Sequence, residues 1–246
     1  MTKQSLAAPD QREFDEFATN GGFEKVFNAS YSKAYALFSF VLAGVLKKYK
    51  PPVRILDIGC GDGWTVEYIS SLNVSGTYLG IDTSAESIAK LMKRIPPGKK
   101  LKVLSMVESA SWLTSRESAF EARKMLDGPP DLIICNAACH QIVKSFPELM
   151  KILSISGSTL KNDGTALVGD YYYPEDLSNE EIEEDRKWIK KTTGQTPTPR
   201  PGFISRNEME LLLKNSGYIA EKVREVRANR DISLIYYLFQ LKPKAK

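Results

Sequence analysis

The sequence has few cysteines, a single histidine and no long hydrophobic run. Its three cysteines, Cys60, Cys135 and Cys139, are odd in number, which argues against a disulfide framework. With one histidine and no second cysteine pair, the chain lacks the ligands of a zinc site, and we expect no metal. No apolar stretch reaches the roughly 20 residues that span a bilayer, and the first residues are polar rather than signal-like. We therefore expect reduced thiols in a cytoplasmic protein without membrane contact.

An excess of charge of one sign is also missing. The chain has 34 basic and 30 acidic side chains, a formal net charge of +4, and its lysine pairs are scattered. Nucleic-acid binding usually requires a concentrated basic surface, so we expect no nucleic-acid partner. A length of 246 residues suits one α/β domain with a large core better than two full domains.

A glycine-rich turn organises the chain. Val53–Ile58 is a short apolar run that predicts a buried strand, and the proline pair before it marks where the strand can begin. Gly59, Gly61 and Gly63 follow at alternate positions, and a helical pattern begins directly after them. Glycine tolerates positive φ and has no Cβ, so a ligand can lie against the backbone of this turn. The helix that follows offers free N–H groups, although any tight strand-to-helix turn could use such glycines.

A second strand pattern, residues 76–81, ends on Asp82, one strand-and-helix unit after Asp57. In a doubly wound sheet this carboxylate lies at the carboxyl edge beside the glycine turn, where it can accept both hydroxyls of a ribose. A nicotinamide-dinucleotide enzyme would place two residues before its last glycine, whereas only Asp62 separates Gly61 from Gly63. The dinucleotide interpretation is therefore disfavoured.

The segment Asp57-Ile58-Gly59-Cys60-Gly61-Asp62-Gly63 resembles the acidic-x-G-x-G-x-G motif of the class I S-adenosylmethionine-dependent methyltransferases. Asp82 matches the acidic residue that closes the second strand in that family. The resemblance covers residues 51–241 at fold level. It implies an α/β fold, a doubly wound seven-stranded and mostly parallel sheet with its last strand antiparallel, and S-adenosylmethionine as cofactor.

The resemblance also implies where the cofactor binds. The turn at residues 59–63 would lie near the methionine portion, Asp82 at the ribose, and the Glu108-Ser109 pair at the adenine. Val107 stands where the family often has a glycine, so the adenine position could shift by one residue. The expected cofactor-binding residues are Tyr31, Asp57, Gly59, Cys60, Gly61, Gly63, Asp82, Thr83, Glu108, Ser109 and Asn136.

Residues 1–50 precede the first strand and predict helices at 10–20, 23–28 and 31–49. We expect them to form a helical N-terminal cap on an α/β domain at residues 51–241. In the resembling family such an extension often covers the cofactor and substrate cleft, and this position makes Tyr31 a candidate cofactor contact. The alternative is that the extension merely covers an open face of the sheet.

Other patterns predict the remaining elements. Helices are expected at residues 85–93, 110–126, 146–160, 177–193 and 207–215. Further strands are expected at residues 101–107, 131–135, 165–169, 219–226 and 232–241. The proline-rich segment 194–204 predicts a loop whose Arg200 and Phe203 can reach a substrate.

Candidate catalytic residues follow the fourth and fifth expected strands. Asn136 matches a position at which the family commonly carries Asp or Asn facing the transferring methyl. His140 has the side-chain type whose pKa lies nearest neutrality, so it could take a proton, although a polar helix cap is an equally ordinary role. The segment Asp170-Tyr171-Tyr172-Tyr173 begins where open α/β sheets bind substrates. Because aromatic faces attract sulfonium and ammonium cations, the tyrosines could line a cofactor and substrate site. The alternative is that the tyrosine run simply continues the strand, since tyrosine favours β-structure.

The expected activity is methyl transfer to an oxygen or nitrogen of a small molecule by a monomer or homodimer. The asparagine-proline-proline-aromatic motif of base and amide methylases is absent, because Ala137-Ala138-Cys139 follows Asn136. One alternative is a methyltransferase-like cyclase, in which Asn136 and Asp170 aim the cofactor's own amino group at its γ-carbon and release methylthioadenosine. The product would be the four-membered azetidine-2-carboxylate. A second alternative is a non-catalytic cofactor-binding module.

Overall fold

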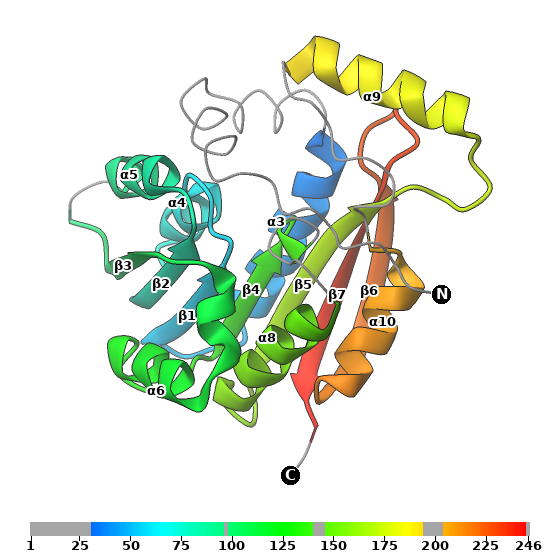
Figure 1. The fold of residues 1–246 in the computed structure, drawn as a ribbon. Helices are drawn as coiled ribbons and strands as arrows, with labels where there is room; N and C mark the ends of the chain where they lie inside the picture. The colour runs from blue at the N-terminus through cyan, green and yellow to red at the C-terminus, as the bar shows by residue number, and fades with distance from the viewer. Residues whose placement is uncertain (1–30, 96–97, 140–145, 194–203, 245–246) are drawn as a thin grey trace.

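The computed structural model describes residues 31–95, 98–139, 146–193 and 204–244 (Figure 1). They form one seven-stranded sheet with the order β3-β2-β1-β4-β5-β7-β6. Strands β1 to β5 are parallel, and β7 runs antiparallel between β5 and β6, so the predicted doubly wound, mostly parallel fold is confirmed. The strands are β1 Val53–Ile58, β2 Gly76–Asp82, β3 Leu101–Val107, β4 Leu132–Asn136, β5 Thr165–Tyr172, β6 Tyr218–Arg227 and β7 Ile235–Pro243.

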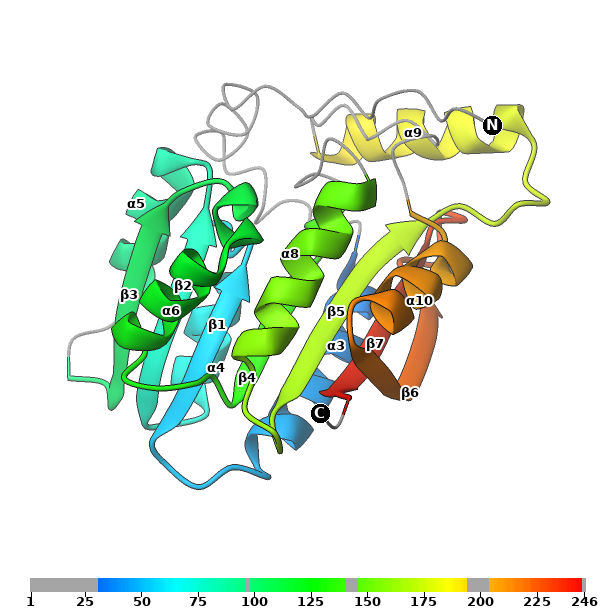
Figure 2. The same ribbon diagram turned by 60° about the horizontal axis from the view of Figure 1, so that its bottom comes forward.

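Helices cover both faces of the sheet, as Figures 1 and 2 show. One face carries α3 Ser32–Leu46, α4 Trp64–Ser71 and α5 Ala85–Arg94. The other carries the short 3-10 helix η1 Ala110–Thr114, α6 Arg116–Met125, α8 Phe146–Thr159 and α10 Arg206–Asn215. Helix α9, Asn179–Thr193, lies at the carboxyl end of β5, and its buried Ile182 and Ile189 join the core of the α3 face.

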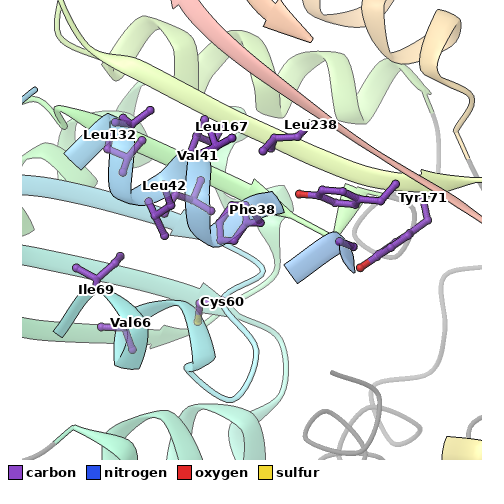
Figure 3. Packing of buried hydrophobic residues seen from close by; sticks show 14 of the residues in the cluster. Phe38, Val41, Leu42, Cys60, Val66, Ile69, Leu132, Leu167, Tyr171 and Leu238 are labelled. Carbon is purple, nitrogen blue, oxygen red and sulfur yellow. The ribbon is translucent and has the colours of Figure 1, made fainter. Parts of the chain in front are cut away.

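Helix α3 is held on the sheet by its buried apolar side. Phe38, Val41 and Leu42 point toward leucines of β4, β5 and β7, as Figure 3 shows. For α3 this packing agrees with the alternative that the N-terminal extension covers a sheet face, and it brings the first residues of α3 to the carboxyl edge. The helices expected at residues 10–20 and 23–28 lie outside the described residues, and the domain boundary at residue 50 stays a prediction.

Several expected boundaries were wrong by one to three residues, and two expected elements need a fuller correction. The helix expected at residues 110–126 is broken, because Leu113 has non-helical dihedral angles and Ser115 starts α6 with its own capping box. Strand β5 does not end at Gly169 but continues through Tyr172, because Asp170, Tyr171 and Tyr172 pair with β7. The alternative interpretation of the tyrosine run, a continuation of the strand, is therefore confirmed through Tyr172.

Within the described part of the chain, no helix has both the length and the apolarity needed to cross a membrane. The same residues contain no group of three or more histidine, cysteine or acidic side chains suited to a metal ion. Cys60, Cys135 and Cys139 are buried and form no disulfide.

Candidate cofactor and acceptor site

The turn after β1 has the tight geometry that its glycines predict. Gly59, Gly61 and Gly63 have φ angles of 73°, 54° and 89°, a region that side chains other than glycine rarely adopt. The backbone N–H groups of Gly59 and Cys60 donate to the carbonyl of Ile81 at 2.8 and 3.1 Å. These bonds join the turn to the end of β2, so the two candidate cofactor-binding segments form one unit.

The far side of the turn is packed against helix α5. A Cβ atom added to Gly63 would lie 2.7 Å from Cγ of Leu91, so the helix approaches more closely than a side chain would allow. Arg94, at the end of α5, forms ion pairs with Asp62 at 2.6 Å and with Glu67 at 2.9 Å. The turn is thereby held between α4 and α5 before any ligand binds.

Asp82 extends this unit toward the carboxyl edge. Its half-buried carboxylate accepts the N–H of Gly61 at 2.8 Å on one oxygen and the N–H of Ser84 at 2.9 Å on the other. An ionised carboxylate has about four lone-pair positions and accepts several hydrogen bonds at once. Its acceptor oxygens therefore suit the hydroxyl groups of the ribose of S-adenosylmethionine. Thr83 is half-buried beside it.

The expected adenine residues lie at the end of β3, next to this carboxylate. The N–H of Glu108 donates to the carbonyl of Asp82 at 2.9 Å, and the Glu108 side chain is exposed. The hydroxyl of Ser109 accepts the N–H of Ser111 at 3.2 Å as the N-cap of η1. Glu108 thus has the freedom to meet a ligand, whereas Ser109 is already engaged in capping.

Asp57 and Cys60 face the protein interior. Asp57 is 1% exposed and accepts the Tyr78 hydroxyl at 2.6 Å. Burial raises the pKa of the Asp57 carboxyl to about 7, an effect that the hydrogen bond from Tyr78 opposes. A Cβ atom added to Gly80 would lie 2.8 Å from the Cys60 sulfur, so the thiol is packed against the backbone of β2. Burial raises the pKa of this thiol well above its ordinary value. Cys60 can therefore contribute through its backbone rather than through a reactive thiolate.

Four tyrosines gather on the α3 face beside the turn, and we call them the tyrosine cluster. The ring centroid of Tyr171 lies 4.8 Å from that of Tyr31 and 5.2 Å from that of Tyr236. Tyr35 completes the set, with its ring edge against Trp64 at 4.6 Å. Burial raises the pKa of each of these phenols, so they are neutral hydroxyl groups at physiological pH.

Asn136 lies next to the tyrosine cluster at the end of β4. The hydroxyl of Tyr236 donates to Oδ1 of Asn136 at 2.5 Å. Gly169 lies between them on β5, and a Cβ at that position would come within 2.8 Å of the same Asn136 oxygen. The absence of a side chain on Gly169 therefore allows the tyrosine and the asparagine to meet.

The expected catalytic run on β5 is divided between the two sheet faces, because side chains alternate along a strand. Tyr171 and Tyr173 belong to the core of the α3 face, whereas Tyr172 packs in the opposite core and its hydroxyl donates to Glu225 at 2.9 Å. Asp170 is fully buried and accepts the N–H of Tyr171 at 2.9 Å. By the same alternation it faces away from Asn136, so those two residues do not converge.

Sequence reasoning missed Tyr35 and Tyr236. Tyr35 lies within the helix expected at residues 31–49 and Tyr236 within the strand expected at residues 232–241, and neither was a candidate site residue. The register that pairs Tyr171 with Tyr236 was the missing signal, because the two strands are far apart in the sequence and no hairpin turn joins them. His140, Arg200 and Phe203 lie outside the described residues.

Comparisons with known proteins agree with the fold and identify the family. The profile of the methyltransferase domain family matches residues 29–223. A carboxy-S-adenosyl-L-methionine synthase from Trichodesmium erythraeum (strain IMS101) is 29% identical over 100 residues, which are 38% of this chain and 40% of that protein. An uncharacterized phycocyanin operon protein W from Pseudanabaena tenuis (strain PCC 7409) is 38% identical over 55 residues, 22% of this chain and 52% of that protein. The chain thus spans about half or less of the length of these curated relatives.

Solved structures share the fold over most of the chain. Magnesium protoporphyrin IX methyltransferase from Synechocystis PCC 6803, with bound S-adenosylmethionine, has a TM-score of 0.61 at 11% identity and covers 97% of this chain and 99% of its own. A methyltransferase from Geobacter sulfurreducens in complex with S-adenosylhomocysteine has a TM-score of 0.55 at 15% identity. The match covers 84% of this chain and 90% of that one. At such identities the likeness establishes the fold, whereas the family profile covers more than half of the chain. The protein therefore belongs to the S-adenosylmethionine-dependent methyltransferases of class I.

Proposed function

We propose that the protein transfers the methyl group of S-adenosylmethionine to an oxygen or nitrogen atom of a small molecule. The observation that carries the proposal is that the glycine turn and Asp82 form one unit. Asn136, at the end of β4, lies at the same carboxyl edge of the sheet, two strands away from Asp82 at the end of β2. The bound cofactor supplies an electrophilic methyl group on a positively charged sulfur. The chain's own residues bind it, exclude water and align the acceptor, which is most of what such a displacement requires.

Each part of the site has a proposed role. The turn at residues 59–63 holds the methionine portion, Asp82 accepts the ribose hydroxyls, and Glu108 with Ser109 borders the adenine. Asn136 and the tyrosine cluster border the transferring methyl group, since aromatic faces stabilise the positively charged sulfur of the cofactor by about 0.5–2 kcal/mol. The acceptor would enter beside them, and we call this part of the site the acceptor side. The neutral phenols supply hydrogen bonds rather than a base. His140 remains the candidate base of the sequence, and Asp170, on the other sheet face, becomes a structural residue in this proposal.

The cyclase alternative depends on Asn136 and Asp170 acting on one amino group. Their placement on opposite faces of the sheet argues against that cooperation, so methyl transfer is favoured. Membership of a transferase family likewise favours an enzyme over a binding module. Synthesis of carboxy-S-adenosylmethionine is the activity of the relative named above, and a match over 40% of that protein does not extend it to this chain.

The nucleoside product tests the proposal. The protein is incubated with S-adenosylmethionine labelled in its methyl group, alone and with mixtures of phenols, carboxylic acids and amines, and the nucleosides are separated. We expect S-adenosylhomocysteine and a labelled acceptor only when an acceptor mixture is present. Methylthioadenosine formed from S-adenosylmethionine alone would instead support the cyclase, and binding without any product would support the module. Light scattering would test the proposed monomer or homodimer.

A further inference from the structure

The hydrogen bond between Tyr236 and Asn136 fixes which end of the asparagine amide is occupied. The tyrosine hydroxyl donates to Oδ1 at 2.5 Å, so the oxygen already has a strong partner. The amide nitrogen has two N–H donors. Among the described residues, no hydrogen bond from this nitrogen is found, and the Asn136 side chain is only half-buried. The asparagine therefore presents N–H donors, rather than its oxygen, to a ligand at the sheet edge.

Three strands are built so that this pair can form. Asn136 on β4 is in register with Gly169 on β5, which is in register with Leu238 on β7. Tyr236, two residues before Leu238, points to the same face and reaches across Gly169. A Cβ on Gly169 would collide with both the tyrosine hydroxyl and the asparagine oxygen. Gly169 does not have a positive φ, so the space above it, rather than a backbone conformation, accounts for the glycine.

Two acidic side chains near this place have their charge reduced or paired, and Asp170, whose charge adds to burial in raising the pKa of Tyr171 and Tyr236, lies on the other sheet face. On the same face, Asp57 shares a hydrogen bond with Tyr78, and its raised pKa leaves it partly neutral at pH 7. Asp62 is ion-paired with Arg94. The phenols of the tyrosine cluster remain protonated, so they add no negative charge, and the hydroxyls other than that of Tyr236 can donate hydrogen bonds to an anion. Hydrogen bonds to an ionised oxygen are roughly twice as strong as those between neutral groups.

We infer that Tyr236 is a positioning residue for Asn136, and that the pair selects an acceptor with an ionised oxygen, such as a carboxylate. This inference rests on the proposed methyl transfer and narrows its substrate class. Methylation of a carboxylate forms one C–O bond as one C–S bond breaks, the electron pair goes to sulfur, and no proton is released. Without the tyrosine hydroxyl the amide can turn over, offer its oxygen and accept a hydrogen bond from an amine.

The test compares two probes of similar size and opposite charge, benzoate and benzylamine. Their binding is measured by isothermal titration calorimetry on the full chain saturated with S-adenosylhomocysteine. We expect benzoate to bind the unchanged protein about tenfold more tightly than benzylamine, the ratio expected from one charge-assisted hydrogen bond. Tyr236→Phe should bring this ratio close to one. Tyr237→Phe is the matched control, because its hydroxyl donates to the carbonyl of Ile204 on the other sheet face.

The probe ratio separates positioning from a merely structural role, since loss of stability would weaken both probes alike. Thermal melting checks that both variants are folded. Failure of benzoate to bind the unchanged protein, or the same ratio in Tyr236→Phe and Tyr237→Phe, would overturn the inference. If S-adenosylhomocysteine binds normally in those experiments, the proposed function stands without the inference. If the unchanged protein does not bind S-adenosylhomocysteine, the proposed function itself fails.

Discussion

Two aspartates near the carboxyl ends of neighbouring strands have different surroundings, and this difference separates their roles. Asp57 is buried at 1% exposure against Tyr78, whereas the half-buried Asp82 is held by two backbone N–H groups at the sheet edge. A resemblance in sequence assigns both to the cofactor. Of the two, only Asp82 is exposed enough to meet a ligand directly, whereas Asp57 is buried and bonded to Tyr78.

The raised pKa of Asp57 leads to a pH-dependent stability. The folded protein holds the carboxyl proton up to about pH 7, whereas the unfolded chain releases it near its ordinary value of 3.8. The stabilisation from this group is therefore fully present below the lower value and is lost as pH rises toward 7. We expect the free energy of unfolding of the unchanged protein, relative to Asp57→Asn, to fall between pH 4 and about pH 7. Urea denaturation at several pH values measures it, and a constant difference would contradict the assignment.

The residues of the candidate site were unequally predictable from the sequence. The glycine spacing and Asp82 are local features, since a tight strand-to-helix turn depends on residues adjacent in the chain. Tyr236 is 100 positions from Asn136, and only strand register brings the two together. The tyrosine run on β5 shows the same limit. Its residues were identified as a group, but the strand continues through Tyr172 and the alternation of faces separates them.

At the scale of single elements, the predicted β1 and β3 agree with the structure at both ends. Proline before β1 and glycine after it set those limits locally. The division between η1 and α6 was not foreseen, because the apolar spacing continues through Ser115 while the capping box interrupts the helix. Local sequence patterns thus predicted where most elements exist. Several of their ends were instead decided by helix capping, as at Ser115, or by pairing with a neighbouring strand, as in β5.

The turn and helix α5 give a prediction for this element pair. Gly63→Ala requires a side chain at a φ of 89° and pushes a Cβ against Leu91, so we expect it to cost about 1–3 kcal/mol of stability. Gly44→Ala is the control, because nothing lies within 4 Å of that position in helix α3. It should stabilise the protein by up to about 1 kcal/mol, since alanine favours helix more than glycine. Equal effects in urea denaturation would refute the close-packing argument.

The attachment of α3 to the sheet can be tested with two phenylalanines two positions apart. Phe38 is fully buried against the sheet, whereas Phe40 is 75% exposed. Phe38→Ala should lower the free energy of unfolding by about 3–5 kcal/mol, and Phe40→Ala should change it by less than about 0.5 kcal/mol. Denaturant titration compares the two. Similar losses would mean that α3 does not use the face seen here.

At the scale of the whole molecule, two hydrophobic cores lie on the two faces of one sheet. The fold class was predictable because alternating strand and helix patterns allow few arrangements, and a parallel sheet must be covered on both faces. The acceptor side was less predictable, since it combines the start of α3 with β4, β5 and β7. These elements meet only when the sheet is complete, so the proposed acceptor side depends on the whole fold, whereas the proposed cofactor site depends mainly on local sequence.

The central claim is that the glycine turn and Asp82 bind S-adenosylmethionine as one unit, and calorimetric titration of that cofactor tests it most directly. Asp163→Ala serves as the charge-matched control, because this aspartate is exposed on the turn before β5. We predict that Asp82→Ala weakens binding by about 1–3 kcal/mol, roughly 5- to 150-fold, while Asp163→Ala leaves it unchanged. Unchanged affinity in a folded Asp82→Ala variant would contradict the account.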